Sequence, residues 1–349
     1  MAGRTRLQRL AGGLEEPLLV TAPVNVRYLS GLDSSNAAVL VEPDGAATLY
    51  TDFRYAEAAA AVGGVDLVET GRALVQELAA LLAGRRIAFE AERLSVADHA
   101  RLAAGGVELV PTHGAVERLR AVKEPDEVDA IRRAAALADR VFEELARARF
   151  TGRSERELAW HVERRLRELG AERVSFPVVV ASGPNGALPH ARPGERVVGA
   201  GELVVVDAGC VVDGYCSDCT RTYATGEPPA DLAEAYAVCL EAQLAGLAAV
   251  RPGVSGAGAD AAARAVIAAA GLGERFGHGL GHGVGLDVHE APTLRPDAAD
   301  VLEPGNVVTV EPGIYLPGAG GVRIEDLVLV TADGCERLTL VPKEPTRVE

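Results

Sequence analysis

The sequence predicts an α+β protein, in which a smaller α/β domain precedes a domain built from a curved mixed sheet with helices on its outside. Three observations support this class. About the first 115 residues alternate short apolar runs with alanine- and leucine-rich stretches, which is typical of an α/β domain. The later residues combine long helical patterns with long strand-like runs. At 349 residues the chain also exceeds the usual size of one domain, so we expect domains at residues 1–118 and 119–349.

The N-terminal domain is expected to contain short strands and two helices. The turn Pro43-Asp44-Gly45 separates two apolar runs, as in adjacent strands that are joined by a tight turn. Strands are predicted at residues 17–20, 37–41, 46–51, 86–90 and 107–110, and helices at residues 55–62 and 72–84.

The start of the second domain is marked by the segment AVKEPDEVDAIRRAAALADRVFEELARA. Pro125 suits the first turn of a helix, and Asp126 and Glu127 stand at its positive end. A second helix begins after Ser154, because Glu157 completes a capping box. Further helices are predicted near residues 232–250 and 260–270, and strands at residues 177–181, 203–212, 307–310 and 322–330.

Bulk composition excludes several classes of partner. The chain is 48% hydrophobic and 24% charged, which is ordinary for a soluble globular protein. Its net charge of −15 disfavours nucleic acids and anionic membranes, and no apolar run reaches the roughly 18 residues of a membrane span. Glycines and glutamates interrupt any signal-peptide core, and the five cysteines suit a reducing compartment. We therefore expect a cytoplasmic protein that binds neither nucleic acid nor membrane.

Five potential metal ligands stand in the C-terminal half of the chain. Each lies in a strand-like or glycine-rich stretch, where a carboxylate is costly unless a cation neutralises it. Four carboxylates and one imidazole are a plausible ligand set for two divalent cations. The five residues are Asp207, Asp218, His282, Glu311 and Glu325.

The first two acids are predicted to face each other across a hairpin. Asp213-Gly214 is a strong hairpin signal, and with these residues as the turn Val212 pairs with Tyr215. The same register pairs the residue two positions after Asp207 with Asp218. The two carboxylates are then diagonal neighbours on one face, roughly 7 to 8 Å apart at the backbone.

The second acid pair stands in VVTVEPGIYLPGAGGVRIEDLVLV. Gly318 is the midpoint between Glu311 and Glu325, and it lies within a turn-like segment. A symmetric hairpin therefore places the two glutamates directly opposite each other. Like charges in that position are unfavourable unless a cation lies between them.

Histidines and glycines gather in FGHGLGHGVGLDVHEAP. His282 stands between glycines, which allow the backbone to approach a site closely, and it is the best ligand candidate of the three histidines there. We expect His278 and His289 to contact the substrate or to support the ligands. Either could stabilise the oxygen of a tetrahedral intermediate.

These motifs, DAG(x)8D, GHGVGL(x)2HE and EPG(x)11E, resemble the signature of the pita-bread metallopeptidases, a family that includes methionine aminopeptidase, aminopeptidase P and prolidase. The resemblance implies a pita-bread catalytic domain and a homo-oligomer, a dimer or larger. It also implies two divalent ions, usually manganese and sometimes cobalt or zinc. Their ligands would be Asp207, Asp218, His282, Glu311 and Glu325, and Glu311 would also transfer protons.

Other motifs resemble the proline-specific branch of that family. NVRYLSGL and YTDFRY resemble its additional creatinase-like N-terminal domain, and ALPHARPG and GGVRIED resemble its substrate pocket. The last two motifs imply that His190 and Arg323 bind the proline-containing peptide, together with His289. Thr293 stands where some prolidases carry an arginine that binds a dipeptide's carboxylate, and Arg295 is a possible substitute.

The sequence therefore predicts a metallo-exopeptidase that removes the residue before a proline in second position, as aminopeptidase P does. Xaa-Pro dipeptidase (prolidase) activity is the alternative, and a non-catalytic binding protein with the same fold is a remote one. Cys216-x-x-Cys219 could be read as a redox or zinc motif, but no second CxxC is present. We expect these two cysteines to be small buried residues.

Overall fold

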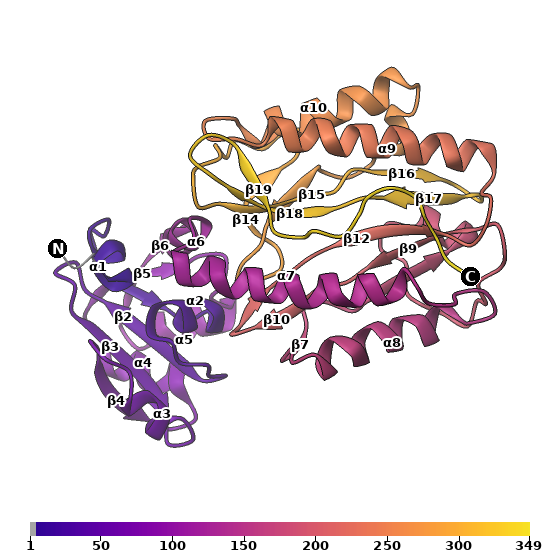
Figure 1. Ribbon diagram of the computed structural model, residues 1–349. Coiled ribbons are helices and arrows are strands. Elements are labelled where there is room, and N and C mark those ends of the chain that lie inside the picture. The colour runs from indigo at the N-terminus through magenta and orange to yellow at the C-terminus, as the bar shows by residue number, and fades with distance from the viewer. Residues whose placement is uncertain (1–4) are drawn as a thin grey trace. The chain divides into compact units, whose positions relative to one another are not determined.

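The computed structural model describes residues 5–349 and divides the chain into two compact units. The first unit ends at Arg120, and the second comprises Ala121–Glu349 (Figure 1).

The first unit is an α/β domain around a mixed six-stranded sheet in the order β4-β3-β2-β1-β5-β6. Its strands are β1 (Leu18–Val20), β2 (Ala37–Val41), β3 (Ala47–Asp52), β4 (Asp66–Thr70), β5 (Arg86–Glu90) and β6 (Glu108–Thr112). Its helices are α1 (Arg6–Ala11), α2 (Pro23–Ser30), α3 (Ala56–Ala60), α4 (Leu74–Leu81), α5 (Val96–Ala104) and α6 (Ala115–Ala121). The five predicted strands and two predicted helices are confirmed. The edge strand β4 escaped prediction because it is mostly exposed and forms no apolar run.

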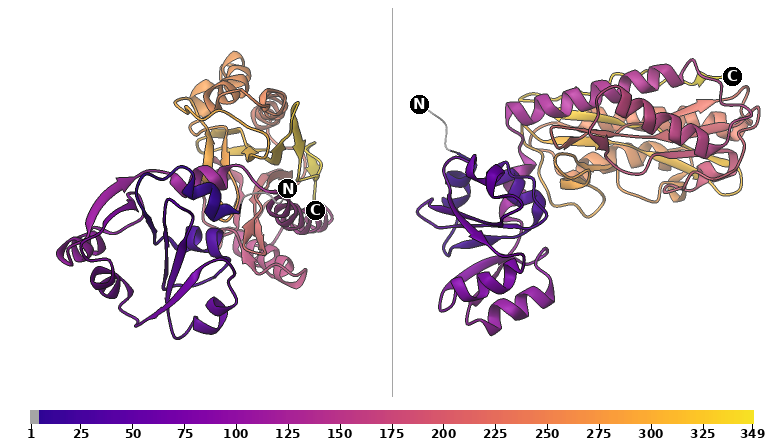
Figure 2. Two further views of the ribbon diagram at one scale, coloured as in Figure 1. Left: turned by 90° about the vertical axis from the view of Figure 1, so that its left-hand side faces the viewer. Right: turned by 90° about the horizontal axis from the view of Figure 1, so that it is seen from below.

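The second unit contains curved sheets between two pairs of long helices. The helices are α7 (Pro125–Leu145), α8 (Glu155–Glu168), α9 (Ala230–Ala249) and α10 (Gly256–Ala269), with short 3-10 turns η1 (Gly183–Ala187) and η2 (Gly273–Arg275). Figures 1 and 2 show α7 and α8 on one side of the strands and α9 and α10 on the other. The predicted mixed sheet with outer helices is confirmed. The predicted helix starts are confirmed as well, since Pro125 opens α7 and Ser154 caps α8 with Glu157.

The strands of this unit form two larger sheets, with the orders β20-β12-β9-β8 and β14-β13-β15-β18-β19, and two small ones, β11-β10-β7 and β16-β17. Their bounds are β7 (Arg173–Val174), β8 (Val179–Ser182), β9 (Leu203–Asp207), β10 (Cys210–Val212), β11 (Tyr215–Cys216), β12 (Thr220–Ala224), β13 (Gly281–Gly283), β14 (Glu290–Leu294), β15 (Val307–Val310), β16 (Gly313–Leu316), β17 (Gly320–Arg323), β18 (Asp326–Val330), β19 (Cys335–Arg337) and β20 (Thr346–Arg347).

Two predicted strands are each divided in the structure. Residues 203–212 form β9 and β10, and residues 322–330 fall into β17 and β18. In both cases the chain passes from one sheet to another at the break. The prediction of continuous strands was wrong because an apolar run does not reveal which neighbour each part pairs with. The breaks matter for function, since Asp207 ends β9 and Glu325 lies between β17 and β18.

Helix α9 is long and apolar enough, by length and composition, to cross a membrane. Its buried residues, which include Leu232, Tyr236 and Cys239, belong to the hydrophobic core that also contains residues of the β15–β18 strands. This packing is that of a core helix.

Candidate metal centre

The first acid pair lies where β9 ends beside the start of β12. Val212 pairs with Tyr215, as predicted, and the same register pairs Asp207 with Thr220. Asp207 is therefore opposite a residue only two positions from Asp218, which is the predicted diagonal arrangement. The hairpin register brings both carboxylates to one place.

The second acid pair is framed by paired residues on both sides. Val310 pairs with Asp326 in β15 and β18, and Gly313 pairs with Arg323 in β16 and β17. The symmetric hairpin register predicted for Glu311 and Glu325 is thus confirmed. Single carboxylate oxygens of Asp207, Asp218 and Glu325 lie within 4.8 Å of one another.

His282 is the middle residue of β13 and joins this cluster. Its Nε2 atom is 3.1 Å from Glu311 Oε1 and 3.9 Å from Asp218 Oδ2. Its Nδ1 atom donates to the carbonyl oxygen of Gly283 at 3.1 Å, which leaves Nε2 directed at the acids. The structure therefore brings all five candidate ligands together in one cavity.

Close backbone packing at Gly209 supports the first acid pair. A Cβ atom at this position would overlap the carbonyl oxygen of Ser217, the residue before Asp218. We expect Gly209→Ala to lower the free energy of unfolding by about 1–3 kcal/mol, as overpacking does, and to weaken metal binding. Urea denaturation and metal titration measure the two effects. Gly334→Ala is a matched control, since a Cβ there meets nothing within 4 Å, and an equal loss in both variants would contradict the expectation.

Burial and mutual repulsion disfavour the charged forms of several carboxylates in the acid cluster. Burial, and after it the neighbouring carboxylates, hold the pKa of Asp218 and of Glu325 well above the usual range. Burial also raises the pKa of Asp207, although Arg323 opposes this. For Glu311, burial alone would raise the pKa, but the hydrogen bond and charge of His282 bring it down to about 2. Burial works against the charge on His282 as well, yet Glu311 raises its pKa.

These residues fit divalent cations. Asp207 Oδ1 is buried and has no hydrogen-bond partner among residues 5–349, so one acceptor atom in the cluster is left without a donor. The four carboxylates outnumber the basic groups that contact them, which within residues 5–349 are Arg323 and His282. Hard oxygen donors with one imidazole suit such ions chemically.

Arg323 lies beside the cluster and is almost fully buried. Its Nη2 atom donates to Asp207 Oδ2 at 2.6 Å, and its Nη1 atom donates to Tyr315 Oη at 3.1 Å and to the Pro189 carbonyl oxygen at 3.2 Å. Its Nε atom contacts Thr220 Oγ1, which donates to Glu325 Oε2 at 2.7 Å. Sequence reasoning missed Thr220 and Tyr315. Thr220 could have been found, since the hairpin register places it opposite Asp207.

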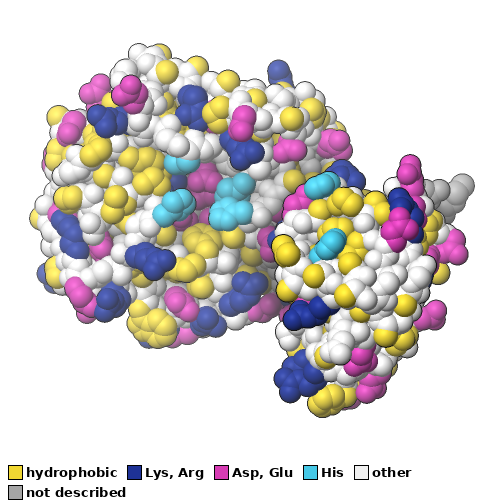
Figure 3. Space-filling model, turned by 180° about the vertical axis from the view of Figure 1, so that it is seen from behind, with side chains coloured by type: hydrophobic (Ala, Val, Ile, Leu, Met, Phe, Trp, Pro, Cys, Tyr) yellow, Lys and Arg dark blue, Asp and Glu magenta, His cyan; other side chains and the backbone are white. Residues whose placement is uncertain are grey.

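The cluster lies in a cavity of about 460 Å³ that is also lined by His190, His278, His289, Arg295 and Arg323. Figure 3 shows histidine side chains around a hollow of the larger unit, with acidic side chains visible inside it. The acids are buried or partly buried, whereas His190, His289 and Arg295 are exposed. The cavity therefore has an acidic interior and basic groups accessible to solvent.

The histidines that line the cavity differ in their partners. His278 Nδ1 contacts the Gly279 carbonyl oxygen at 2.8 Å, so this nitrogen carries the proton, and Nε2 accepts from Tyr315 Oη at 2.8 Å. The ring of His289 packs edge-on against that of His282, with centroids 4.3 Å apart. Burial lowers the pKa of both His278 and His289, which favours neutral rings near pH 7.

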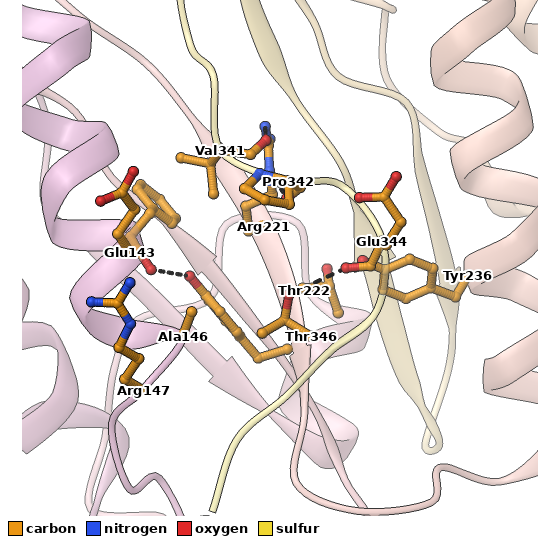
Figure 4. Close-up of a pocket in the computed structure, with 12 residues that line it drawn as sticks. Glu143, Ala146, Arg147, Arg221, Thr222, Tyr236, Val341, Pro342, Glu344 and Thr346 are labelled. Carbon is orange, nitrogen blue, oxygen red and sulfur yellow. Dashed lines mark hydrogen bonds between the residues drawn. The ribbon is translucent and has the colours of Figure 1, made fainter.

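A second cavity, of about 290 Å³, is lined by α7, β12, α9 and the C-terminal segment (Figure 4). Tyr223 donates there to the carbonyl oxygen of Phe142 at 3.0 Å, and Thr346 donates to that of Glu344 at 3.3 Å. The candidate ligands line the first cavity and not this one.

The cysteines beside Asp218 are free and buried. Burial raises the pKa of the Cys216 thiol to about 11 and that of Cys219 well above its usual range, so both stay protonated. The prediction of small buried residues at these positions is confirmed.

Comparison with known proteins gives two family matches and close relatives. Residues 129–332 match Metallopeptidase family M24, and residues 8–122 match the Creatinase/Prolidase N-terminal domain. Uncharacterized peptidase YqhT of Bacillus subtilis is 41% identical over 346 residues, which cover 97% of this chain and 98% of that protein.

Two solved structures are similar over nearly their whole length. An Xaa-Pro dipeptidase from Bacillus anthracis has a TM-score of 0.94 and 39% identity, and the match covers 98% of this chain and 99% of that one. An X-Pro aminopeptidase from Thermotoga maritima has a TM-score of 0.89 and 34% identity, and the match covers 98% and 100%.

Proposed function

Because the chain belongs to metallopeptidase family M24, we propose that it is an Xaa-Pro dipeptidase that uses two divalent metal ions. Membership confirms the resemblance found in the sequence, and with it the pita-bread catalytic domain that follows a creatinase-type N-terminal domain. The protein is a metallo-exopeptidase of the prolidase and aminopeptidase P group. The observation that carries the proposal is the acid cluster inside a cavity with exposed His190, His289 and Arg295.

The choice between dipeptidase and aminopeptidase differs from the preference drawn from the sequence, which was for aminopeptidase P. Identity and TM-score are both higher for the Bacillus anthracis Xaa-Pro dipeptidase than for the Thermotoga maritima X-Pro aminopeptidase. Arg295 adds a chemical reason. It is exposed at the cavity and pairs with Asp297 only at the surface, at 3.1 Å, so it is free to bind the carboxylate of a dipeptide.

Five residues would hold the metal ions: Asp207, Asp218, His282, Glu311 and Glu325. Support comes from the unpartnered Asp207 Oδ1 and from the close approach of the carboxylates. The chemistry that two divalent ions supply in such a site is a water of lowered pKa and a polarised scissile carbonyl group. Manganese suits the oxygen-rich donor set, with cobalt or zinc as alternatives.

The chain's own residues would bind the substrate and move protons. Glu311, which lies 3.1 Å from His282 Nε2 within the acid cluster, would take a proton at a carboxylate oxygen and later return it to the leaving amine. His289, whose ring is accessible, donates a hydrogen bond to the oxygen that becomes negative in the transition state. His278 uses both ring nitrogens within the protein and holds Tyr315 beside Arg323.

His190 and Arg323 would shape the proline pocket. Arg323 donates to the carbonyl oxygen of Pro189, so it fixes the backbone next to His190 as well as Asp207. We also propose a homo-oligomer, dimeric or larger, in the cytoplasm. The five free cysteines, four of which are buried, support this location.

The dipeptidase proposal is tested with Ala-Pro, its amide and Ala-Pro-Ala, assayed in manganese. We expect Ala-Pro to be cleaved with the highest kcat/KM. Arg295→Met should lower kcat/KM for Ala-Pro about 10- to 150-fold and leave the amide unchanged, since a hydrogen bond to a charged group contributes about 1.5–3 kcal/mol. Preferential cleavage of Ala-Pro-Ala would contradict the proposal and favour the aminopeptidase alternative. Arg251→Met, at an exposed arginine away from the cavity lining, is the control.

A further inference from the structure

Lys123 and Glu290 form a buried ion pair that joins distant parts of the second unit. Lys123 Nζ donates to Glu290 Oε1 at 2.7 Å, and the two side chains are 1% and 6% exposed. A buried ion pair gains little net stability over a well-packed apolar pair, because both charges lose their hydration. Its position therefore points to a role other than stability.

Glu290 directly follows His289 and begins β14. It pairs with Gly283 of β13, although His282 pairs with Thr293, so the register shifts between His282 and Gly283. Such bulges re-aim side chains beside active sites. The connection from Gly283 to Glu290 carries His289, and its path decides where that ring lies.

The glycine at position 285 makes room for the carboxylate. A Cβ atom on Gly285 would overlap Glu290 Oε1, so the carboxylate lies directly against the connecting segment. The backbone N–H of Asp287 also donates weakly to Glu290 Oε2, at 3.4 Å. From the other side, the backbone N–H of Cys216 donates to the Gly285 carbonyl oxygen at 2.8 Å.

Lys123 itself is held in place by the backbone. Its N–H donates to the Gly305 carbonyl oxygen at 2.8 Å, and the adjacent Val122 forms a bridge with Asn306. These residues come just before β15, which leads to Glu311. The lysine thus connects the backbone just before β15, the strand that leads to Glu311, to the segment that carries His289.

From this geometry we propose that Lys123 and Glu290 are positioning residues, which fix the segment 284–290 so that His289 meets the reacting oxygen. The inference rests on the role of His289 in the proposed function. Lys123→Met should lower kcat about tenfold with little change in KM and in bound metal, because His289 acts in the transition state.

A double-mutant cycle with His289→Ala tests the inference on the substrate that the wild type cleaves best. We expect His289→Ala alone to lower kcat about 100-fold, as does the loss of an oxyanion donor. In that background Lys123→Met should change kcat less than twofold, because the group that it positions is gone. An undiminished tenfold loss there would overturn the positioning role while leaving that of His289 intact. Full activity of His289→Ala would overturn both.

Lys123→Met removes the ammonium group that lies 2.7 Å from the buried Glu290 carboxylate, and this loss could unfold the protein. The variant Lys123→Met/Glu290→Gln removes both charges, and we expect it to recover the melting temperature but not kcat. Recovery of both would reduce the pair to a structural role and overturn the proposal. Arg165→Met, which breaks the partly exposed pair with Glu144 between α7 and α8, is the matched control and should retain wild-type kcat.

Discussion

Asp218→Asn is expected to abolish peptidase activity and, at the same time, to stabilise the metal-free protein. The carboxylate is buried among Asp207, Glu311 and Glu325, which disfavour its charge. Asparagine removes that repulsion at nearly unchanged volume, so the urea midpoint without metal should rise. Without this carboxylate the metal ions lose a ligand, and kcat/KM should fall by about three orders of magnitude, or about 4 kcal/mol.

The readout for Asp218→Asn is urea denaturation with and without manganese, beside the activity assay. Manganese should raise the midpoint of the wild type but not that of the variant, because a ligand stabilises only the state that binds it. Asp213→Asn, in the exposed hairpin turn, is the matched control, since asparagine tolerates the positive φ of 49° found there. A metal-dependent shift of normal size in Asp218→Asn would remove Asp218 from the ligand set.

Arg323→Met is also expected to abolish activity. Unlike Asp218→Asn, however, it should destabilise the metal-free protein. Arg323 is 4% exposed and its guanidinium bonds to Asp207, so without it the metal-free cluster loses the basic group beside that carboxylate. Breaking a buried pair by removing one partner costs about 3–5 kcal/mol, so the urea midpoint without metal should fall markedly. Manganese should restore part of the loss by supplying positive charge to the same carboxylates.

The control for Arg323→Met is Arg132→Met, which breaks a half-exposed pair with Glu336. There we expect a change of only about 0–1 kcal/mol, as for surface ion pairs. An Arg323→Met protein that is as stable as the wild type without metal would show that Asp207 does not depend on the arginine. The opposite signs expected for Asp218→Asn and Arg323→Met separate excess negative charge from general disruption of the site.

Local patterns were enough to predict both acid pairs. The Asp213-Gly214 turn set one register, and the symmetry of Glu311 and Glu325 about Gly318 set the other; both registers are those of the structure. Hairpin geometry depends on neighbours in the chain, so it can be read from sequence. The same holds for the helix starts, where capping and proline act within one turn.

The strand breaks at Gly209 and Glu325 could not be predicted in this way. A run of valines looks the same whether it stays in one sheet or passes to another, and only the packing of both sheets decides where it turns. The contact of Arg323 with Asp207 joins residues 116 positions apart, and no local pattern indicates it.

The sequence by itself determined the chemistry: four carboxylates and one histidine, in registers that bring them together, and the family that uses them. Only the tertiary structure decided what surrounds them. Lys123 reaches Glu290 across 167 positions, and Arg295 remains exposed at the cavity. The physical reason is that a ligand set depends on residue type and short-range register. The groups that position and neutralise it are brought in by long-range packing, which follows from the whole fold.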